Sequence, residues 1–328
     1  MRAVVHDRYG GPEVLRIEDV PRPVPGADEV LVRVRATGVT RGDAHQRAGE
    51  PFIGRLVSRA PLRPRRRILG HEFAGEVEAV GAGVTEFAPG DRVFAALPYL
   101  ALETGSHAEY IAVPERFPLV PMPEGLSFEQ AGAIGDGALL TLNCLRPAGA
   151  LTGKRLLVFG GSGAIGTATV QLAKHFGAHV TAVCKPEALE LARSLGADVV
   201  IDSTREDFTA RGETWDVIVD AVGRHHPYTF RRCKRVLSPG GAYLPTDRLW
   251  NFVLWLYHRR FGDKKVQFEL PPRMRKEDLL FLRDLIEAGE YRPVIDRTYV
   301  FEDVAEAHRY VDTGRKNGNV VLTLAEGG

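Results

Sequence analysis

A glycine-rich loop between a predicted strand and a predicted helix constrains the fold of this chain more than any other feature. Residues Leu156–Phe159 form a continuous apolar run, and they are followed by Gly160-Gly161-Ser162-Gly163-Ala164-Ile165-Gly166. Apolar residues then recur up to Phe176 with the spacing of a helix. Glycines here let phosphate oxygens approach backbone N–H groups at the positive end of that helix. The loop therefore predicts that residues 160–166 bind the diphosphate of a dinucleotide, and the alternative is a tight turn without a ligand.

Strands and helices alternate through the middle of the chain. Pro186 suits the first turn of a second helix, and Gly196 would end that helix. Short apolar runs predict further strands at 179–183, 199–201, 217–222 and 242–244. A repeated strand–helix–strand order requires a parallel sheet covered by helices on both faces. We therefore predict an α/β protein containing a Rossmann doubly wound parallel sheet.

The first third of the chain has the alternation of half-buried β-strands. From Val30 to Arg35, valines alternate with residues that include two arginines. Similar runs, separated by turns rich in proline and glycine, lie at 76–80, 92–94 and 108–113. The end of the chain adds predicted helices at 276–288 and 304–311 and a strand at 319–324. Since 328 residues suggest about two domains, a β-rich, barrel-like domain should accompany the Rossmann domain.

Composition excludes several classes of protein. The chain has 43 Lys and Arg against 42 Asp and Glu, so its net charge of +1 gives no reason to expect nucleic acid or an anionic membrane as a partner. Three separated cysteines exclude a disulfide scaffold and a cysteine-rich zinc lobe. The apolar run at 249–257 is too short to span a bilayer, and the run at the N-terminus is too short for a signal peptide. The expected location is the reducing cytoplasm.

The end of the second Rossmann strand bears on the choice of cofactor. An acidic residue there would hold the ribose 2′-hydroxyl of NAD. This chain has Cys184-Lys185-Pro186 instead, and its next carboxylate is Glu187 in the helix start. Lys185 could pair with the 2′-phosphate of NADP(H), so we predict NADP(H) as the cofactor. The alternative for Lys185 is an exposed loop lysine without a ligand.

Several short motifs resemble those of the medium-chain dehydrogenase/reductase superfamily. In order along the chain, they are Gly70-His71-Glu72-Phe73-Ala74-Gly75, Pro89-Gly90-Asp91-Arg92-Val93, the glycine loop, Asp220-Ala221-Val222-Gly223, Pro239-Gly240-Gly241 and the segment 318–324. The resemblance covers nearly the whole chain, and it is greatest to the zinc-independent, quinone oxidoreductase-like branch. It implies a GroES-like catalytic domain at 1–122 and 272–328 and a Rossmann domain at 123–271, with the active site in the cleft between them. It also implies that Val222, Gly223 and Arg315 contact the cofactor.

The resemblance also addresses the metal. Zinc alcohol dehydrogenases of this superfamily use a cysteine, the histidine of the Gly-His-Glu motif and a second cysteine as catalytic ligands. In this chain Thr40 and Asp136 stand where the two cysteines would be, while His71 is retained. A catalytic zinc site needs three protein ligands, and threonine is a poor one. We predict no zinc, and the alternative recruits Asp43 or Glu72 as a third ligand.

Without a metal, the enzyme must stabilise a developing oxyanion through hydrogen bonds or a general acid. A quinone or an enone fits this requirement because its negative charge is delocalised. The candidate donors are Thr40, Asp43, His45 and His71, and a purely structural role is the alternative for each of them. Relatives often have a threonine beside the nicotinamide. Thr141 is a weak counterpart of that threonine in this chain.

Two further segments have open interpretations. Six arginines between 55 and 67 could contact an anionic substrate or cofactor tail, or they could form a solvated loop. The aromatic-rich segment 250–268 could form a homodimer contact, line an apolar substrate site or pack in the core.

The sequence therefore predicts an NADPH-dependent oxidoreductase that transfers hydride to a quinone, an enone or an activated carbonyl compound without zinc. Two alternatives stay open. One is a zinc-free or weakly metal-dependent alcohol dehydrogenase, and the other is a nucleotide-binding relative without turnover.

Overall fold

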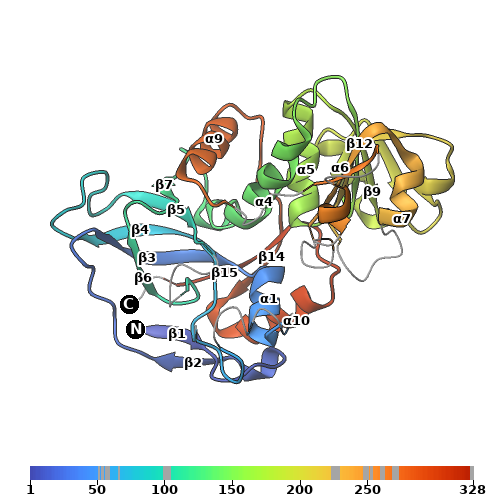
Figure 1. The fold of residues 1–328 in the computed structure, drawn as a ribbon. Helices are drawn as coiled ribbons and strands as arrows, with labels where there is room; N and C mark the ends of the chain where they lie inside the picture. Colours follow the sequence, from blue (N-terminus) through green and yellow to red (C-terminus); the bar gives the residue numbers. More distant parts are fainter. Residues whose placement is uncertain are drawn as a thin grey trace. The chain divides into compact units, whose positions relative to one another are not determined.

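The chain folds into two compact units. The structure is a computed structural model that describes residues 1–50, 52, 55, 60–65, 67–98, 105–222, 230–246, 251, 254–258, 263–267 and 273–325. The first unit comprises Met1–Asp136 and Met274–Gly328, and the second comprises Gly137–Arg273. Figure 1 shows both units and labels many of their helices and strands. Among the described residues, no helix is both long enough and apolar enough to cross a membrane.

The second unit is built on a six-stranded sheet in which every pair of neighbours is parallel. Its strands are β8 (Arg155–Phe159), β9 (His179–Cys184), β10 (Val199–Asp202), β11 (Trp215–Asp220), β12 (Leu237–Pro245) and β13 (Lys265–Val266). The strand order is β10-β9-β8-β11-β12-β13. The order reverses between β8 and β11, and doubly wound sheets bind their ligands at this point, beyond the carboxyl ends of the strands. The predicted Rossmann sheet is confirmed.

Helices connect these strands and cover the sheet. They are α4 (Gly135–Leu145), η2 (Arg146–Ala148), α5 (Ala164–His175), η3 (Pro186–Ala188), α6 (Leu189–Ser194), η4 (Phe208–Ala210), α7 (Phe230–Cys233) and η5 (Lys234–Val236). All residues of α5 from Gly166 to Ala173 are buried, so only the two ends of this helix are exposed to solvent. Gly177 follows it with a φ of 80°, the left-handed conformation that glycine adopts easily.

The first unit contains a seven-stranded sheet with both parallel and antiparallel neighbours. Its strands are β3 (Glu29–Gly38), β4 (Glu72–Val80), β5 (Arg92–Ala96), β7 (Leu119–Pro121), β14 (Ile295–Val300) and β15 (Asn319–Thr323), with β6 (Tyr110–Pro114) paired to β3. Strand β15 runs antiparallel to β3 and parallel to β14. The C-terminal strands, red in Figure 1, therefore complete the N-terminal sheet.

The rest of the first unit surrounds this sheet. Strands β1 (Arg2–Val5) and β2 (Arg16–Asp19) form a hairpin around η1 (Pro12–Val14), and the helices are α1 (Arg41–Ala48), α3 (Phe128–Ala131), α9 (Lys276–Glu287), η6 (Phe301–Asp303) and α10 (Val304–Asp312). Helix α10 packs on α1 and on β15. Because α3 packs on β3 and β4, it lies in the first unit. The second unit thus begins at Gly137, whereas the sequence places the start of the Rossmann domain at residue 123.

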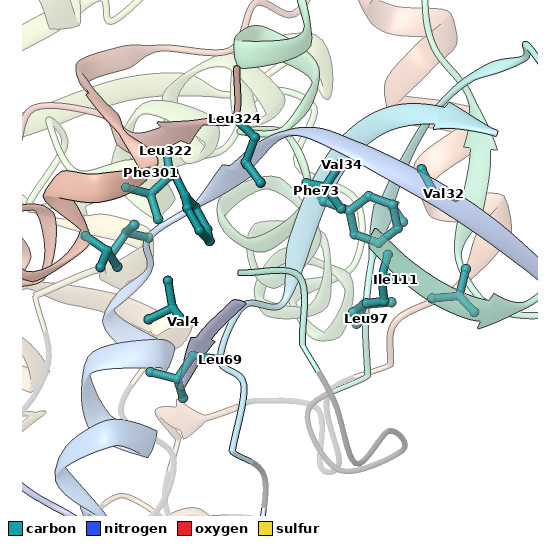
Figure 2. Packing of buried hydrophobic residues seen from close by; sticks show 14 of the residues in the cluster. Val4, Val32, Val34, Leu69, Phe73, Leu97, Ile111, Phe301, Leu322 and Leu324 are labelled. Atoms are coloured by element: carbon teal, nitrogen blue, oxygen red, sulfur yellow. The ribbon is translucent and has the colours of Figure 1, made fainter. Parts of the chain in front are cut away.

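Figure 2 shows the apolar core of the first unit. Phe73 from β4 lies with Val34 from β3 and Ile111 from β6, and all three side chains are buried. Phe301 and Leu322 from the C-terminal part belong to the same cluster as Val4. This shared core explains why residues after 274 belong to the first unit, since burial of apolar surface is the main favourable term in folding.

Candidate nucleotide loop and catalytic cluster

The glycine loop follows β8 directly, and a side chain would be strained at two of its glycines. Gly160 has a φ of 81°, and a Cβ on it would lie 2.5 Å from Cγ2 of Val222. A Cβ on Gly166 would lie 2.0 Å from the backbone oxygen of Gly160. The loop therefore turns tightly, and the first turn of α5 lies directly against it.

The backbone amides of the loop fall into two groups. The N–H groups of Gly160 and Gly161 donate to the oxygen of Val183 at 3.0 and 3.1 Å, and that of Gly163 donates to Gly160 at 3.2 Å. These three amides hold the turn on the sheet. The first amides of an α-helix have no acceptor within the helix, and Gly163 provides no side-chain cap for α5. The N–H groups of Ala164 and Ile165 are therefore available to donate hydrogen bonds to a phosphate.

The position of Gly163 at the start of α5 is open. A Cβ on Gly163 would have only the oxygen of Gly160 near it, at 3.8 Å, so the helix start is open there. The geometry thus separates residues that shape the loop (Gly160, Gly161 and Gly166) from residues that would contact the ligand (Ser162, Ala164 and Ile165). Gly163 belongs to both groups, because its amide closes the turn and its lack of a side chain leaves the helix start open. The sequence motif predicts contacts from all seven without this distinction.

Lys185 lies beside this loop on the sheet. It is exposed and follows the last residue of β9, the neighbour of β8. The carboxylate nearest in the sheet register is Asp202 at the end of β10, which pairs with Cys184. One oxygen of Asp202 accepts the N–H and the hydroxyl of Thr204 at 2.8 and 2.7 Å. A 2′-phosphate role for Lys185 stays a prediction that this position supports.

The end of β11 forms the other side of the loop. Val222 is about half exposed, and its amide donates to Oδ1 of Asp220 at 3.1 Å. Oδ2 of Asp220 accepts the hydroxyl of Tyr243 at 2.6 Å, which holds the carboxylate in place. Gly223, predicted to contact the cofactor, lies outside the described residues.

Thr141 has a structural role. Its fully buried hydroxyl donates to the oxygen of Gly137 at 2.9 Å and lies 3.1 Å from the oxygen of Ile165. These contacts join α4 to the start of α5. The hydroxyl is therefore already used, which argues against a contact with the nicotinamide.

The catalytic candidates of the first unit centre on Asp43. Thr40 is the N-cap of α1, and its hydroxyl lies 3.1 Å from the amide of Asp43 and 2.7 Å from Oδ2. Oδ2 also accepts the backbone N–H of Thr40 at 2.9 Å. Thr40 and Asp43 form a capping box, so the threonine hydroxyl is engaged in holding the helix start.

The other oxygen of Asp43 holds His71. Oδ1 accepts the amide of Gly70 at 3.0 Å and lies 2.7 Å from Nδ1 of His71. Burial would raise the pKa of Asp43, but the His71 imidazole and the hydrogen bonds from His71 and Thr40 outweigh burial and hold the pKa of Asp43 well below its usual range. An ionised Asp43 requires the proton of His71 to be on Nδ1, which directs Nε2 away from the aspartate.

His45 is separated from this dyad. It lies on α1 two residues after Asp43 and is exposed, whereas Asp43 and His71 are buried. Residues two apart on a helix do not face each other. The structure thus brings together Thr40, Asp43 and His71 and leaves His45 on the surface of the first unit.

A second buried carboxylate lies next to the dyad in sequence. Glu72 accepts the amide of Asp136 at 2.7 Å, and a Cβ on Gly38 would lie 2.0 Å from its Oε1. The lack of a side chain at Gly38 therefore makes room for this carboxyl group. Burial, with the nearby charges of Asp136 and Asp43, raises the pKa of Glu72 to about 8.

The donor set does not fit a catalytic zinc ion. Among the described residues, no group of three or more His, Cys, Asp and Glu side chains is placed to hold a metal. The hydroxyl of Thr40 caps a helix, and both carboxylate oxygens of Asp43 are hydrogen-bonded to protein groups. The alternative in which Asp43 is a third ligand therefore has no support in this geometry.

Arg315 is an exposed residue between α10 and β15 in the first unit. Its amide donates to the hydroxyl of Thr313 at 3.2 Å. The next residue, Lys316, donates from Nζ to the oxygen of Gly318 at 2.9 Å. A contact between Arg315 and the cofactor stays a prediction.

Sequence analysis missed a buried histidine cluster in the first unit. Nδ1 of His308 accepts from Arg47 at 2.9 Å, and the ring of His308 lies 5.8 Å from that of His107. His107 in turn lies 3.0 Å from the oxygen of Gly38. These residues come from α1, α10, the end of β3 and a loop, so no local pattern could have revealed them. The capping box was detectable, because Thr40 and Asp43 have its spacing.

The fold and the loop together define a nucleotide-binding protein that contains a GroES-like domain and a Rossmann sheet. A family model described as alcohol dehydrogenase GroES-like domain matches residues 26–124, and one described as zinc-binding dehydrogenase matches residues 195–322. The chain belongs to the medium-chain dehydrogenase/reductase superfamily, in its quinone oxidoreductase-like branch.

Relatives with curated names extend over almost the whole chain. The chain is 32% identical to 2-methylene-furan-3-one reductase of Solanum lycopersicum over 98% of its own length and 79% of that protein. It is 33% identical to the chloroplastic NADPH-dependent alkenal/one oxidoreductase of Arabidopsis thaliana, with the same two coverages. It is 32% identical to quinone oxidoreductase of Pseudomonas aeruginosa, over 96% of this chain and 97% of that one. The solved quinone oxidoreductase of Coxiella burnetii matches with a TM-score of 0.88 and 25% identity, covering 99% of each chain.

Proposed function

We propose that this protein is an NADPH-dependent reductase of enones or quinones. The observation that carries the proposal is the loop at 160–166, where the open and uncapped start of α5 fits a dinucleotide diphosphate. The names of the relatives support the substrate class, since they include an alkenal/one oxidoreductase and a quinone oxidoreductase. The exposed Lys185 at the end of β9 supports NADP(H) rather than NAD(H).

Different residues of the chain would have different roles in this reaction. NADPH, when bound, supplies a hydride, and the substrate then needs one proton to give the saturated ketone or the hydroquinone. Amides at the start of α5 would hold the diphosphate, and Lys185 would neutralise the 2′-phosphate. In the first unit, Asp43 fixes the Nδ1 proton of His71, so that Nε2 is the atom that would carry a transferable proton. Thr40 keeps Asp43 in place by capping α1.

The first test pairs two substitutions at one position. Gly163→Asp places a carboxylate where the diphosphate would lie, and we expect NADPH affinity to fall at least about 100-fold. Gly163→Ala adds only a Cβ at a φ of −72°, which any residue adopts, so this variant controls for folding and should lose much less affinity. Equal NADPH affinity in both variants and in the wild type would refute the assignment of the loop.

Activity is tested by NADPH oxidation against a panel of quinones, enones, aldehydes and alcohols. Turnover of enones or quinones supports the proposal. Turnover of simple alcohols and aldehydes alone would favour a zinc-free alcohol dehydrogenase. Tight NADPH binding without turnover of any compound would favour a binding protein.

Finer features are also part of the proposal. We propose a cytoplasmic homodimer that takes an apolar or conjugated substrate. The three cysteines are buried and form no disulfide, as in proteins of reducing compartments, and Leu256 and Tyr257 are more than half exposed apolar side chains. Sedimentation of the purified protein tests the dimer, and cell fractionation tests the location.

A further inference from the structure

A pocket in the first unit lies apart from all the residues predicted for catalysis or cofactor binding. It has a volume of about 510 Å³ and is lined by Asp7, Arg8, Glu13, Val14, Arg16, Leu62 and Arg63. Its walls are the turn after β1, the region of η1 and β2, and the residues Leu62 and Arg63. Pockets that bind small molecules have volumes of about 300–1,000 Å³, so this pocket is large enough for a small metabolite.

One wall of the pocket is electrostatically neutral. Arg16 pairs with both Asp7 and Glu18, and Arg67 pairs with the same two carboxylates, at 2.6 Å from Asp7. The hydrogen bonds from Arg67 and Arg16 lower the pKa of Asp7 to about 2, so Asp7 keeps its negative charge at neutral pH. Two positive and two negative charges therefore cancel, and this wall is a fixed frame rather than a source of binding charge.

The remaining charges of the pocket do not cancel. Arg8 and Arg63 are exposed, and in the described part of the chain neither makes a hydrogen bond or an ion pair with a carboxylate. Among the described residues that line the pocket, Glu13 is the one other charged residue outside the neutral wall, and its carboxylate accepts the backbone N–H of Gly11 at 3.0 Å. The pocket thus presents two guanidinium groups without partners against one carboxylate that already has a donor.

We propose that this pocket binds a small phosphate monoester whose organic part is short and apolar. Guanidinium groups match the oxygens of a phosphate in geometry, and two of them match its charge of nearly two. Leu62, with 87% of its surface exposed, and the buried Val14 provide the apolar contact for the rest of the ligand. This also gives a role to part of the arginine-rich segment, which the reductase function does not use.

The test uses butyl phosphate as the probe, with the full chain saturated with NADPH so that the cofactor loop is occupied. Isothermal titration should show one site in the wild-type protein. Arg8→Glu with Arg63→Glu should weaken butyl phosphate at least about 10-fold, because both unpartnered cations become anions. Arg116→Glu with Arg309→Glu makes the same change of charge at two exposed arginines of the first unit outside the pocket, and it should leave binding unchanged.

Two more probes identify the ligand chemistry. Leu62→Ser should weaken butyl phosphate but not inorganic phosphate, and butyrate should bind more weakly than butyl phosphate. No binding to the wild-type protein would overturn the proposal, and so would equal losses in the two double variants. Butyrate binding as tightly as butyl phosphate would overturn the preference for a phosphate. Since NADPH oxidation is measured separately, failure here is distinguishable from failure of the proposed reductase activity.

Discussion

Replacing Glu72 by glutamine should change how the stability of the protein depends on pH. The carboxyl group of Glu72 is 1% exposed, and its pKa is raised to about 8 by burial and by the charges of Asp136 and Asp43. Lys316 opposes this shift as a nearby cation, and Tyr291 is a further titratable neighbour. Glutamine keeps an oxygen that can accept the amide of Asp136 but has no proton to lose.

The sign and size follow from proton linkage. An exposed glutamate in the unfolded chain has a pKa of about 4.3. Near neutral pH the folded state therefore holds a proton on Glu72 that the unfolded state has lost. This difference stabilises the folded state at low pH, and the stabilisation is lost as the pH rises through the folded pKa of about 8. Between about pH 6 and about pH 8 the wild-type protein should lose about 2 kcal/mol that Glu72→Gln does not lose.

Urea unfolding of both proteins, with NADPH absent, measures this difference. The comparison cancels the other titrating groups, because they are present in both chains. Tyrosine fluorescence and far-ultraviolet circular dichroism should be recorded together, since two units need not unfold in one step. Parallel stability curves for the two proteins across this range would refute the reasoning, because Glu72 would then ionise alike in the folded and unfolded states.

Three further outcomes are expected. His71→Gln should lower kcat by about 100-fold or more with little change in NADPH affinity. Asp43→Asn should also lower kcat, because it disturbs the tautomer of His71. Unchanged kcat in both variants would show that neither residue takes part in catalysis. Burial lowers the pKa of His308 well below its usual value. As the pH falls from about 6.5 to about 5.5, the free energy of unfolding of the wild type should therefore decrease by about 1 kcal/mol more than that of His308→Gln. Equal decreases for the two proteins, measured by urea unfolding, would contradict this. Prolonged dialysis against a chelator should leave turnover unchanged. If turnover is lost and is then restored by added zinc, the enzyme depends on a metal.

The fold was predictable because its main determinants are local. The run Leu156–Phe159 and the glycines after it belong to one continuous segment, and the strand–loop–helix order follows from that segment alone. The alternation from Val30 to Arg35 likewise marks β3. The packing of α3 on β3 and β4 was not predictable in this way, because it depends on contacts between segments far apart in the sequence rather than on a pattern within any of them.

The catalytic cluster shows where local patterns stop being informative. The sequence identified Thr40, Asp43, His45 and His71 as one set of donors, but only tertiary structure separates the buried aspartate–histidine pair from an exposed helix residue. Asp43 is fixed by Thr40 three residues before it and by Gly70 and His71 nearly thirty residues later. A carboxylate with that many donors has one orientation, and it therefore determines which nitrogen of His71 carries the proton. No group of three zinc ligands is found among the described residues. Because Asp43 holds the Nδ1 proton of His71, Nε2 is the nitrogen that would exchange a proton with a substrate, and on this ground we propose His71 as the residue that completes the reduction.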